Sequence, residues 1–303
     1  MKSTLGGKLH YEHFQNHPSA GNILLRRNIH RIEKGLSMKE RRDIFALDYI
    51  RRTVDIFCQY HENLECEGCK GDEYQWFRDV LAEYFRVSGT HPCIEECKLL
   101  FLNTLKDEET GDSLPYQRDL KTPLACDYAA LKQLVIRRRS VRWFLDKTVP
   151  RGLIEKAIEV GLYSASACNR QPFAFKIFDD KSHAIEIAQF AMGTAGYEHQ
   201  IPCLIVVVGH LNAYFSERDR HLIYIDASLA ITPFMMACET LGLATCAINW
   251  PDIEAREKGL QKRLELKPWE RPIMQIAVGY PDPEMKVPRS VKKGVNEMIQ
   301  WKK

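Results

Sequence analysis

The chain has 303 residues, 45% of them hydrophobic, so it is long enough to bury a full core in one large domain or two smaller ones. Its 43 basic and 40 acidic side chains are interspersed and leave a formal charge of only +3, which argues against a nucleic-acid partner. No apolar run reaches the roughly 20 residues that span a bilayer, so we expect no membrane span.

The first third of the chain is expected to be all-helical. Its first 14 residues lack the apolar segment of a secretory signal, which predicts a cytoplasmic protein with mostly reduced cysteines. Apolar residues at helical spacing, for example Ile44, Leu47, Ile50, Val54 and Phe57, predict two or more amphipathic helices between residues 22 and 60. Helical patterns then follow over 74–87 and 93–105.

One helical segment is unusually basic. Arg27, His30, Arg31 and Lys34 are spaced to share a face, which either covers a ligand cleft and binds an anionic group or is simply solvated. In the second case the helix packs through its apolar residues, such as Ile29.

A linker separates this region from a mixed domain. Over residues 106–124 the hydrophobic periodicity fails, and glycine, prolines and many charges appear. We place the boundary near residue 122, with a helical extension over 1–122 and a second domain over 123–303. There, predicted helices alternate with short β-rich runs, which indicates an α+β domain. Strands are expected over 173–179, 203–209 and 273–280, and helices over 152–165, 182–191 and 224–244.

The helix expected from about residue 223 to 241 is apolar nearly all round. Such a helix lies buried between layers or in a subunit interface.

The stretch RRRSVRWF, residues 137–144, concentrates positive charge next to a hydroxyl. Arginine presents a planar fork of donors that matches a phosphate group, so Arg138, Arg139 and Arg142, with Ser140 among them, are candidates for binding a phosphorylated ligand. The alternative is a solvated basic turn at a helix end, where cations suit the negative end of the helix dipole.

The segment SASACNRQPFAF, residues 164–175, is a polar loop between a predicted helix and a predicted strand. Its serines, asparagine and glutamine can hydrogen-bond ring carbonyls and nitrogens. An extended backbone would point Asn169 and Gln171 to the same side. The alternative is a polar turn that caps the preceding helix.

Taken in order, RRSVRWF, YSASACNRQPFAFKI, DASLAITPFMMACETLGLATCAI and IAVGYPD resemble the nitroreductase family of flavin-dependent oxidoreductases. The resemblance covers roughly residues 125 to 300, and the ordered set of motifs makes it specific. It implies a nitroreductase-like α+β fold, with a mixed or antiparallel sheet flanked by helices, and a homodimer with FMN at the subunit interface.

The resemblance also implies a place for each site residue. The phosphate and ribityl tail of FMN would lie on Arg138, Ser140 and Arg142, with Arg139 beside them. Arg289 with Lys292 or Lys293 would complete the phosphate clamp. The polar loop, mostly from the partner subunit, and one backbone segment would contact the flavin ring, through Ser166, Cys168, Asn169, Gln171 and Pro172 and through Ala247, Ile248, Asn249 and Trp250.

Two departures from the family pattern bear on specificity. Many relatives have glutamate at the position of Asn249, so the donor or acceptor is expected to differ. Trp250 stands where glycine is common, which predicts a narrower cleft or a shifted loop.

The implied chemistry needs no catalytic side chain, because the flavin carries it. NADH or NADPH would reduce FMN at N5 and leave, and a small conjugated acceptor such as a nitroaromatic or quinone would then take the same place. Two alternatives remain open. One is a specialised relative that performs reductive dehalogenation, flavin consumption, or peptide or sugar modification. The other is a catalytically idle flavin-binding interaction module.

A metal site is the further possibility in the helical region. Cys66 and Cys69, followed by Cys93 and Cys97, have spacings that can hold tetrahedral zinc, with His61 and His91 nearby. Equally, the second pair can pack as small apolar groups on an amphipathic helix. We assign no metal ligand on this pattern alone.

Overall fold

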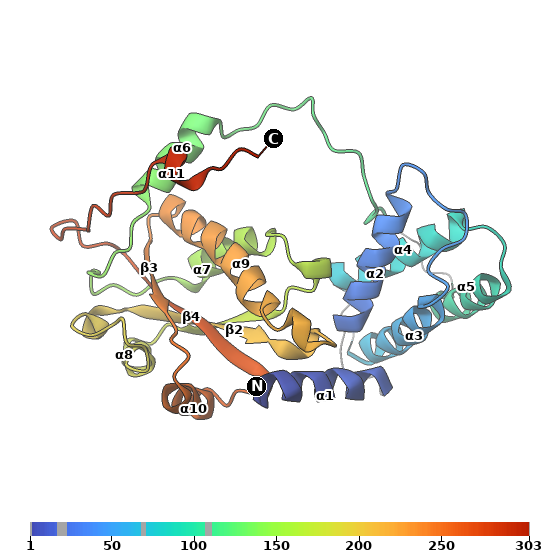
Figure 1. Cartoon of the computed structure of the whole chain (residues 1–303), viewed down its shortest axis with the longest axis horizontal. Coiled ribbons are helices and arrows are strands. Elements are labelled where there is room, and N and C mark those ends of the chain that lie inside the picture. The colour runs from blue at the N-terminus through green and yellow to red at the C-terminus, as the bar shows by residue number, and fades with distance from the viewer. Residues whose placement is uncertain (1, 17–22, 68–70, 107–110, 303) are drawn as a thin grey trace.

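The computed structural model describes residues 2–16, 23–67, 71–106 and 111–302. Figure 1 shows a helical body beside a sheet flanked by helices, with the chain crossing between them along one edge. The α+β fold with an antiparallel sheet and an all-helical N-terminal region agrees with the expectation from the sequence. The position of the domain boundary near residue 122 stays a prediction.

The helical body has its own core, built from large side chains that are fully buried. Phe57, Phe77, Tyr84 and Phe101 come from three different helices and pack together with Ile29. Burial of this apolar area drives the packing of these helices. The N-terminal helices are α1 (Lys2–Asn16), α2 (Ile23–Leu36), α3 (Ile50–Glu67), α4 (Asp72–Val87) and α5 (Pro92–Leu105).

One expected helical stretch is wrong. Ile44 and Leu47 lie outside any helix and are each 39% exposed. The chain turns at Ala46, whose φ of 64° is left-handed, and α3 begins only at Ile50. A residue with this backbone conformation interrupts a right-handed helix whatever the spacing of apolar side chains around it.

Helix α1 packs on the sheet side of the molecule rather than within the helical body. It contacts the 3-10 turn η4 (Leu211–Ala213) and strand β4. The His10 ring stacks on Trp269, with ring centroids 3.6 Å apart. The first helix therefore ties the N-terminal region to the sheet.

The sheet has four antiparallel strands in the order β1-β2-β4-β3. Ile205 and Val207 of β2 face helices α7 and α9, whereas Leu204 and Val206 face α8 and α10, as the alternation of a strand requires. The sheet is therefore covered on both faces and β2 is buried throughout. The strands are β1 (Phe173–Phe178), β2 (Cys203–His210), β3 (Ala244–Asn249) and β4 (Glu270–Gly279). The helices of this part are α6 (Tyr128–Arg137), α7 (Arg151–Leu162), α8 (Lys181–Ala188), α9 (Leu222–Thr240), α10 (Glu254–Arg263) and α11 (Val295–Met298).

Helix α9 has one buried face and one exposed face. The buried face, which includes Ala227, Ala230 and Phe234, packs on α7 and the sheet. Tyr224, at 38%, and Ile225, at 47%, are exposed on the other face. Residues Glu217–Thr240 are long and apolar enough, by length and composition alone, to cross a membrane, a test that core helices of globular domains also pass. Packing on the sheet accounts for the apolar character of the buried face, whereas the apolar residues of the other face are exposed.

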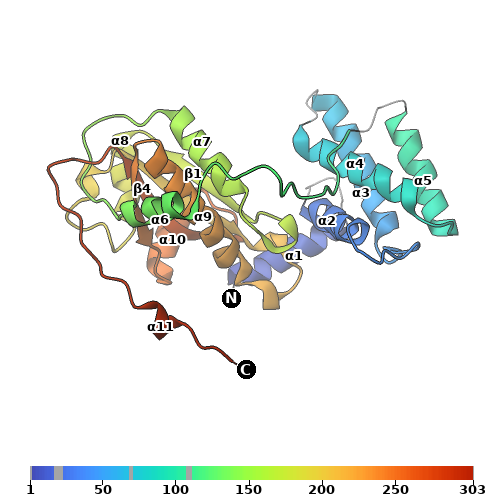
Figure 2. The ribbon, with the colours of Figure 1, turned by 90° about the horizontal axis from the view of Figure 1, so that it is seen from above.

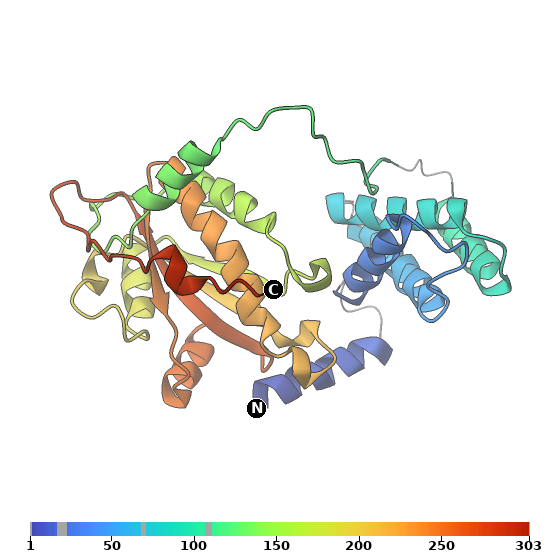
Figure 3. The same ribbon diagram turned by 45° about the horizontal axis from the view of Figure 1, so that its top comes forward.

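Two long segments run over the surface without regular structure. One is 111–127, which leads from the helical body to α6; the other follows β4 and carries only the short helix α11. Figure 2 shows the C-terminal segment extending away from the rest of the molecule. Figure 3 shows segment 111–127 arching between the helical body and α6. Both carry exposed aromatic residues, such as Tyr116 at 88% and Trp301 at 91%.

Candidate functional site

The arginine stretch leaves the end of α6 and joins the outer edge of the sheet. The Asp127 side chain caps the start of α6 by accepting from the Ala130 N–H at 2.8 Å. The helix ends at Arg137, after which Ser140 forms a parallel bridge to Thr245 of β3. The Val141 N–H donates to the Thr245 carbonyl at 3.1 Å. The residues that follow α6 are therefore held along β3.

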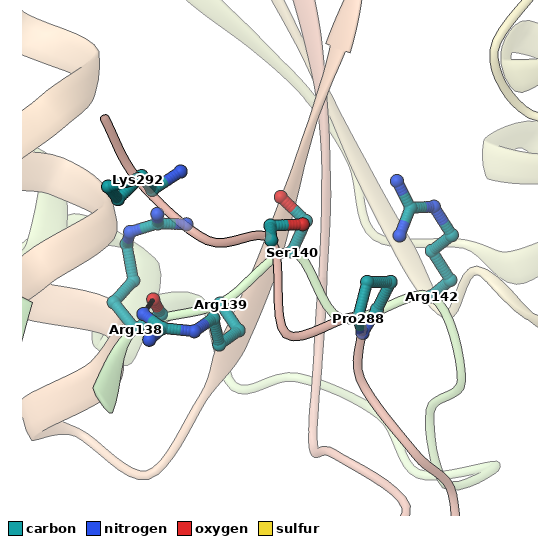
Figure 4. Close-up of a pocket in the computed structure, with 7 residues that line it drawn as sticks. Arg138, Arg139, Ser140, Arg142, Pro288 and Lys292 are labelled. Atoms are coloured by element: carbon teal, nitrogen blue, oxygen red, sulfur yellow. Dashed lines mark hydrogen bonds between the residues drawn. The ribbon is translucent and has the colours of Figure 1, made fainter. Parts of the chain in front are cut away.

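A small pocket of about 110 Å³ opens beside this stretch. Figure 4 shows Arg138 and Lys292 on one side of Ser140 and Arg142 on the other. The predicted clamp residues Arg138, Arg139, Ser140, Arg142 and Lys292 thus meet in one place, together with Pro288 and Ser290, which the sequence did not single out.

The charge of this pocket is uniformly positive. Its four charged residues are all cations, and none of them forms an ion pair with a residue that the structure describes. The neighbouring Arg137, which lies outside the pocket, does have a partner, because its Nε donates to Glu239 at 2.8 Å. Unpaired cations gathered around a hydroxyl have the chemistry that suits a phosphate group.

The C-terminal segment reaches the pocket because it first pairs with the chain after Arg142. The Leu145 N–H donates to the Tyr280 carbonyl at 2.9 Å, and the Asp282 N–H donates to the Trp143 carbonyl at 3.1 Å. This pairing brings Pro288, Ser290 and Lys292 back to the arginines. Arg289, predicted to share the clamp, does not line the pocket.

The outer edge of β3 continues from the pocket. In an antiparallel strand the N–H and C=O of one residue point to the same side, and the side alternates along the chain. Since the Thr245 carbonyl points outward to Val141, the backbone groups of Ala247 and Asn249 also point outward. The side chains of Ala247 and Asn249 are exposed as well.

The other two residues predicted to contact the flavin ring from this segment, Ile248 and Trp250, have inward side chains. Ile248 is 3% exposed and Trp250 is 8% exposed, and both belong to the core that the sheet shares with α8 and α10. The indole of Trp250 therefore packs in the core, and the expected narrowing of a cleft by its bulk is wrong.

The polar loop has a backbone that the sequence did not predict. Cys168, Asn169 and Gln171 have φ values of 55°, 50° and 48°, so the loop is left-handed rather than extended. The expectation that Asn169 and Gln171 point to the same side of an extended chain is therefore wrong. Three non-glycine residues in this region of φ/ψ space carry strain, which the surrounding structure has to hold.

Two contacts hold this loop. Buried Asp226 on α9 accepts from the Ala167 N–H at 2.9 Å, and the Ser166 hydroxyl accepts from the Gln171 N–H at 3.1 Å. The Tyr214 hydroxyl donates to the same carboxylate at 3.2 Å. Burial raises the pKa of Asp226 above its usual value, and the donors from Ala167 and Tyr214 offset part of that rise. The role of Asp226 was not predicted from the sequence.

The loop and the arginine pocket lie at opposite edges of the sheet. The loop precedes β1, which is one edge strand, whereas the pocket adjoins β3, which is the other. Three interstrand spacings, roughly 14 Å in total, separate these edges. One chain therefore does not bring the two halves of the predicted site together.

Helix α2 of the helical body contacts the loop directly. Arg26 Nε donates to the Asn169 carbonyl at 2.9 Å, and its Nη2 donates to Gln171 Oε1 at 3.2 Å. Its remaining nitrogen pairs with Glu73 of α4. Arg26 was not among the residues singled out from the sequence.

The basic face of α2 is largely engaged within the chain. The Arg31 guanidinium lies 3.6 Å from the centroid of the Tyr49 ring, and Arg27 lies 5.8 Å from that of Phe215. His30 pairs with Glu33 at 3.2 Å. Ile29 is fully buried, so the helix packs through its apolar side. That its basic face binds an anionic group stays a prediction.

The possible zinc site can be followed only in part. Cys69 and the side chain of Cys66 lie outside the described residues. His61 hydrogen-bonds the Tyr74 hydroxyl at 2.7 Å, and His91 caps α5 by accepting from the Cys93 N–H at 3.2 Å. Burial raises the pKa of the Cys97 thiol to about 12. Within the described ranges, no three metal-binding side chains gather in one place.

Comparison with known proteins shows which family the sheet-bearing part of the chain is similar to. The model of the nitroreductase family matches residues 135–200 and 193–280. A provisionally named NADH dehydrogenase/NAD(P)H nitroreductase from Methanothermobacter thermautotrophicus is 24% identical over 144 residues, which are 48% of this chain and 73% of that protein.

The fold of this part of the chain is similar to that of solved structures. A Bacillus subtilis protein provisionally named a nitroreductase superposes with a TM-score of 0.51 at 19% identity, over 58% of this chain and all of the other. A nitroreductase family protein from Streptococcus pneumoniae superposes with a TM-score of 0.49 at 21% identity, over 57% of this chain and 100% of the other. Residues 135–280, the sheet-bearing part of the chain, therefore match the nitroreductase family of oxidoreductases.

Proposed function

We propose that the protein is an FMN-dependent oxidoreductase. It transfers hydride from NADH or NADPH to a conjugated acceptor such as a nitroaromatic or a quinone, and it works as a homodimer. The observation that carries the proposal is the pocket of unpaired cations at the edge of β3, where Arg138, Arg139, Arg142 and Lys292 surround Ser140.

The residues of this pocket fit the phosphate end of FMN. Four cations without a carboxylate in the same lining repel one another unless an anion is present. A phosphate group with nearly two negative charges is the matching ligand, because arginine forks and a serine hydroxyl donate to its oxygens. A neutral or cationic ligand would leave the repulsion in place.

The rest of the cofactor would run along β3. Ala247 and Asn249 turn backbone N–H groups toward the outer edge, where they can donate to ring nitrogens and carbonyls. When bound, FMN supplies the chemistry, since its N5 accepts and returns hydride. The chain would bind and orient the cofactor through the arginine pocket and the outward backbone groups of Ala247 and Asn249. No side chain of this protein is needed as a general acid or base in this scheme.

A second copy completes the site. Ser166, Asn169, Gln171 and Pro172 lie at the opposite edge from the arginine pocket, so they would contact the flavin held by the partner copy. The exposed apolar side chains favour the same conclusion, because a surface of this kind normally meets another protein surface. They lie on α6, on the outer faces of α7 and α9, and on the C-terminal segment, and include Tyr128, Leu131, Tyr163, Ile225, Leu229, Val295, Met298 and Trp301.

Three measurements test the proposal in order. The purified protein should be yellow with a flavin absorption spectrum, or should take up added FMN from solution. Mixing the loaded protein with NADH or NADPH under anaerobic conditions should bleach the flavin band in a stopped-flow experiment. A well-folded protein that stays colourless with added FMN contradicts the cofactor, and a flavin that neither nicotinamide reduces leaves only a binding module.

A specialised relative is the second candidate, and the contact of α2 with the polar loop favours it. Arg26 and Glu73 place the helical body against the loop at Asn169 and Gln171, which would restrict what enters above the flavin. Reductive dehalogenation, flavin consumption, and peptide or sugar modification are reactions of this kind. Steady-state rates with a panel of nitroaromatics and quinones separate the two: failure with every member, despite a reducible flavin, selects the specialised enzyme.

We also place the protein in the cytoplasm. The eight cysteines that the structure describes are free thiols, the state that a reducing compartment maintains.

A further inference from the structure

One arginine of the helical body is bound directly to the polar loop. Figure 1 shows α2 on the side of the helical body that faces the sheet, and Arg26 lies in its first turn with a side chain that is 15% exposed. Its Nε donates to the Asn169 carbonyl at 2.9 Å, and its Nη2 donates to Gln171 Oε1 at 3.2 Å. Its Nη1 pairs with Glu73. Because the guanidinium is planar and its donors point in fixed directions, these bonds fix where the loop lies against α2.

Other side chains of the helical body hold the Arg26 guanidinium in place. Glu73 of α4 accepts from it and also from the Tyr60 hydroxyl of α3, which lies 3.4 Å away. The guanidinium carbon lies 5.4 Å from the centroid of the Trp76 ring, an attractive arrangement of a cation and an aromatic face. The Trp76 indole in turn donates to Glu33 of α2 at 3.3 Å. The orientation of Arg26 therefore depends on α2, α3 and α4 being packed together.

The loop that Arg26 holds is strained. Asn169 and Gln171 have φ values of 50° and 48°, and such values persist in non-glycine residues only where neighbouring groups hold them. The Gln171 amide is tied on both sides, since its Nε2 donates to the Leu162 carbonyl at 2.8 Å while its Oε1 accepts from Arg26. At Asn169, Arg26 binds the backbone carbonyl, and the side-chain amide bonds to no residue that the structure describes. The contact therefore fixes the backbone and leaves the Asn169 amide available to a ligand.

Under the proposed function, on which this step rests, the flavin next to the loop belongs to the partner copy. In one chain the loop lies at the β1 edge of the sheet and the arginine pocket lies at the β3 edge. Arg26 binds the loop of its own chain. The helical body of one copy is therefore linked, through Arg26 and Asn169, to the flavin ring in the other copy.

We propose that Arg26 is a positioning residue, through which the helical extension of one copy aims Asn169 at the flavin ring held by the partner copy. Arg26 itself does not touch the flavin. Loss of its planar fork frees the Asn169 carbonyl and the Gln171 amide, so the strained backbone relaxes and the Asn169 amide moves away from the ring. FMN stays bound through its phosphate, because the cations that hold the phosphate lie at the other edge of the sheet. The ring loses a hydrogen-bonding partner, which changes its absorption bands and slows its reduction.

Two substitutions of Arg26 and one matched control test this in the full-length protein loaded with FMN. Arg26→Lys keeps a cation beside Glu73 but has no planar fork for the two loop acceptors. It should shift the absorption and visible circular-dichroism bands of the bound flavin and slow its anaerobic reduction by NADH or NADPH at least tenfold, and Arg26→Ala should do the same. Arg41 also donates to a backbone carbonyl, that of Val87 at 2.9 Å, but within the helical body, so Arg41→Ala should change neither. Unchanged bands and rates in both Arg26 variants overturn the proposal.

A double-mutant cycle separates positioning from a general loss of structure. Asn169→Ala removes the amide that Arg26 aims, so adding Arg26→Ala to it should slow flavin reduction further by less than twofold. Losses that multiply would show that Arg26 acts on the flavin independently of Asn169, and they would overturn the proposed role.

A mixed dimer shows which copy each Arg26 serves. One copy carries Arg138→Ala and Arg142→Ala with a first affinity tag, and the other carries Arg26→Ala with a second tag. At an FMN concentration that does not load the first copy, the doubly purified dimer holds one flavin, on the copy with Arg26→Ala. That flavin should have wild-type bands and a wild-type rate of reduction, because its loop comes from the partner copy, whose Arg26 is intact. A slowly reduced flavin assigns Arg26 to the flavin of its own chain and overturns the proposal.

Failure of the proposed function gives a different result. A wild type that takes up no FMN overturns the proposed function and this inference with it. A wild type whose flavin is reduced at the same rate as that of Arg26→Lys and Arg26→Ala, with the same bands, overturns this inference alone.

Discussion

The arginine pocket makes the sharpest prediction, because the chain supplies its own control. Arg138 and Arg142 line the pocket without ion-pair partners, whereas Arg137, in the same run of three arginines, is 73% exposed in its side chain and pairs with Glu239 outside the pocket. Arg138→Ala and Arg142→Ala should each weaken FMN binding, and Arg137→Ala should not.

The size of the effect follows from the kind of bond lost. A hydrogen bond to a charged group contributes about 1.5–3 kcal/mol, which corresponds to about a 10- to 150-fold rise in Kd for each single variant. An exposed ion pair such as that of Arg137 contributes about 1 kcal/mol or less to stability. The three variants should therefore melt at similar temperatures while differing clearly in FMN affinity.

The assay titrates apoprotein with FMN and, separately, with riboflavin, which lacks the phosphate, and follows the quenching of flavin fluorescence at fixed ionic strength. The loss in Arg138→Ala and Arg142→Ala should be much larger for FMN than for riboflavin, since riboflavin lacks the phosphate that the guanidinium groups bind. An equal loss for both ligands, or unchanged FMN affinity in both variants, would refute the assignment of the phosphate to this pocket.

Three further predictions concern the scaffold. In α7, Gly161→Ala should lower the free energy of unfolding by about 1–3 kcal/mol, because the added Cβ would stand 2.9 Å from the Ala230 carbonyl oxygen. Gly152→Ala, whose added Cβ would meet nothing within 4 Å, should be neutral or stabilising in urea denaturation. Burial raises the pKa of Asp226, so the folded state holds the Asp226 proton more tightly than the unfolded state does. The stability of the wild type should therefore fall relative to that of Asp226→Asn as pH rises above about 4, and parallel melting profiles of the two proteins would contradict this. Removing residues 294–303, which leaves Lys292 in place, should shift the protein toward monomer in light scattering, because Trp301 and its exposed apolar neighbours are lost.

Elements with strong local signals were predictable from the sequence. The buried run of β2 and the apolar helix α9 appear where their patterns indicated. Strand β3 was missed, because ATCAIN is short and its Ala and Cys residues carry a weak β signal. It becomes a strand through pairing with β4, a contact with a partner distant in sequence.

The backbone conformation at the candidate site could not be predicted from the sequence. Cys168, Asn169 and Gln171 adopt left-handed values that their side chains do not favour. They are held by Asp226 from α9, which lies more than 50 residues away in the chain, as the bond from Ala167 shows. Strain of this kind is imposed by tertiary contacts, so no local pattern reveals it.

By itself, the sequence determined which chemistry the chain carries: the run of arginines around Ser140, the polar loop and the order of the motifs are local properties of residues close together in the chain. Only the tertiary structure decided which of these groups meet. The return of the chain after β4 adds Lys292 to the arginines, while the order β1-β2-β4-β3 sends the polar loop to the opposite edge. Side-chain chemistry is local, but proximity depends on strand order and on long-range pairing, which burial of the whole core selects.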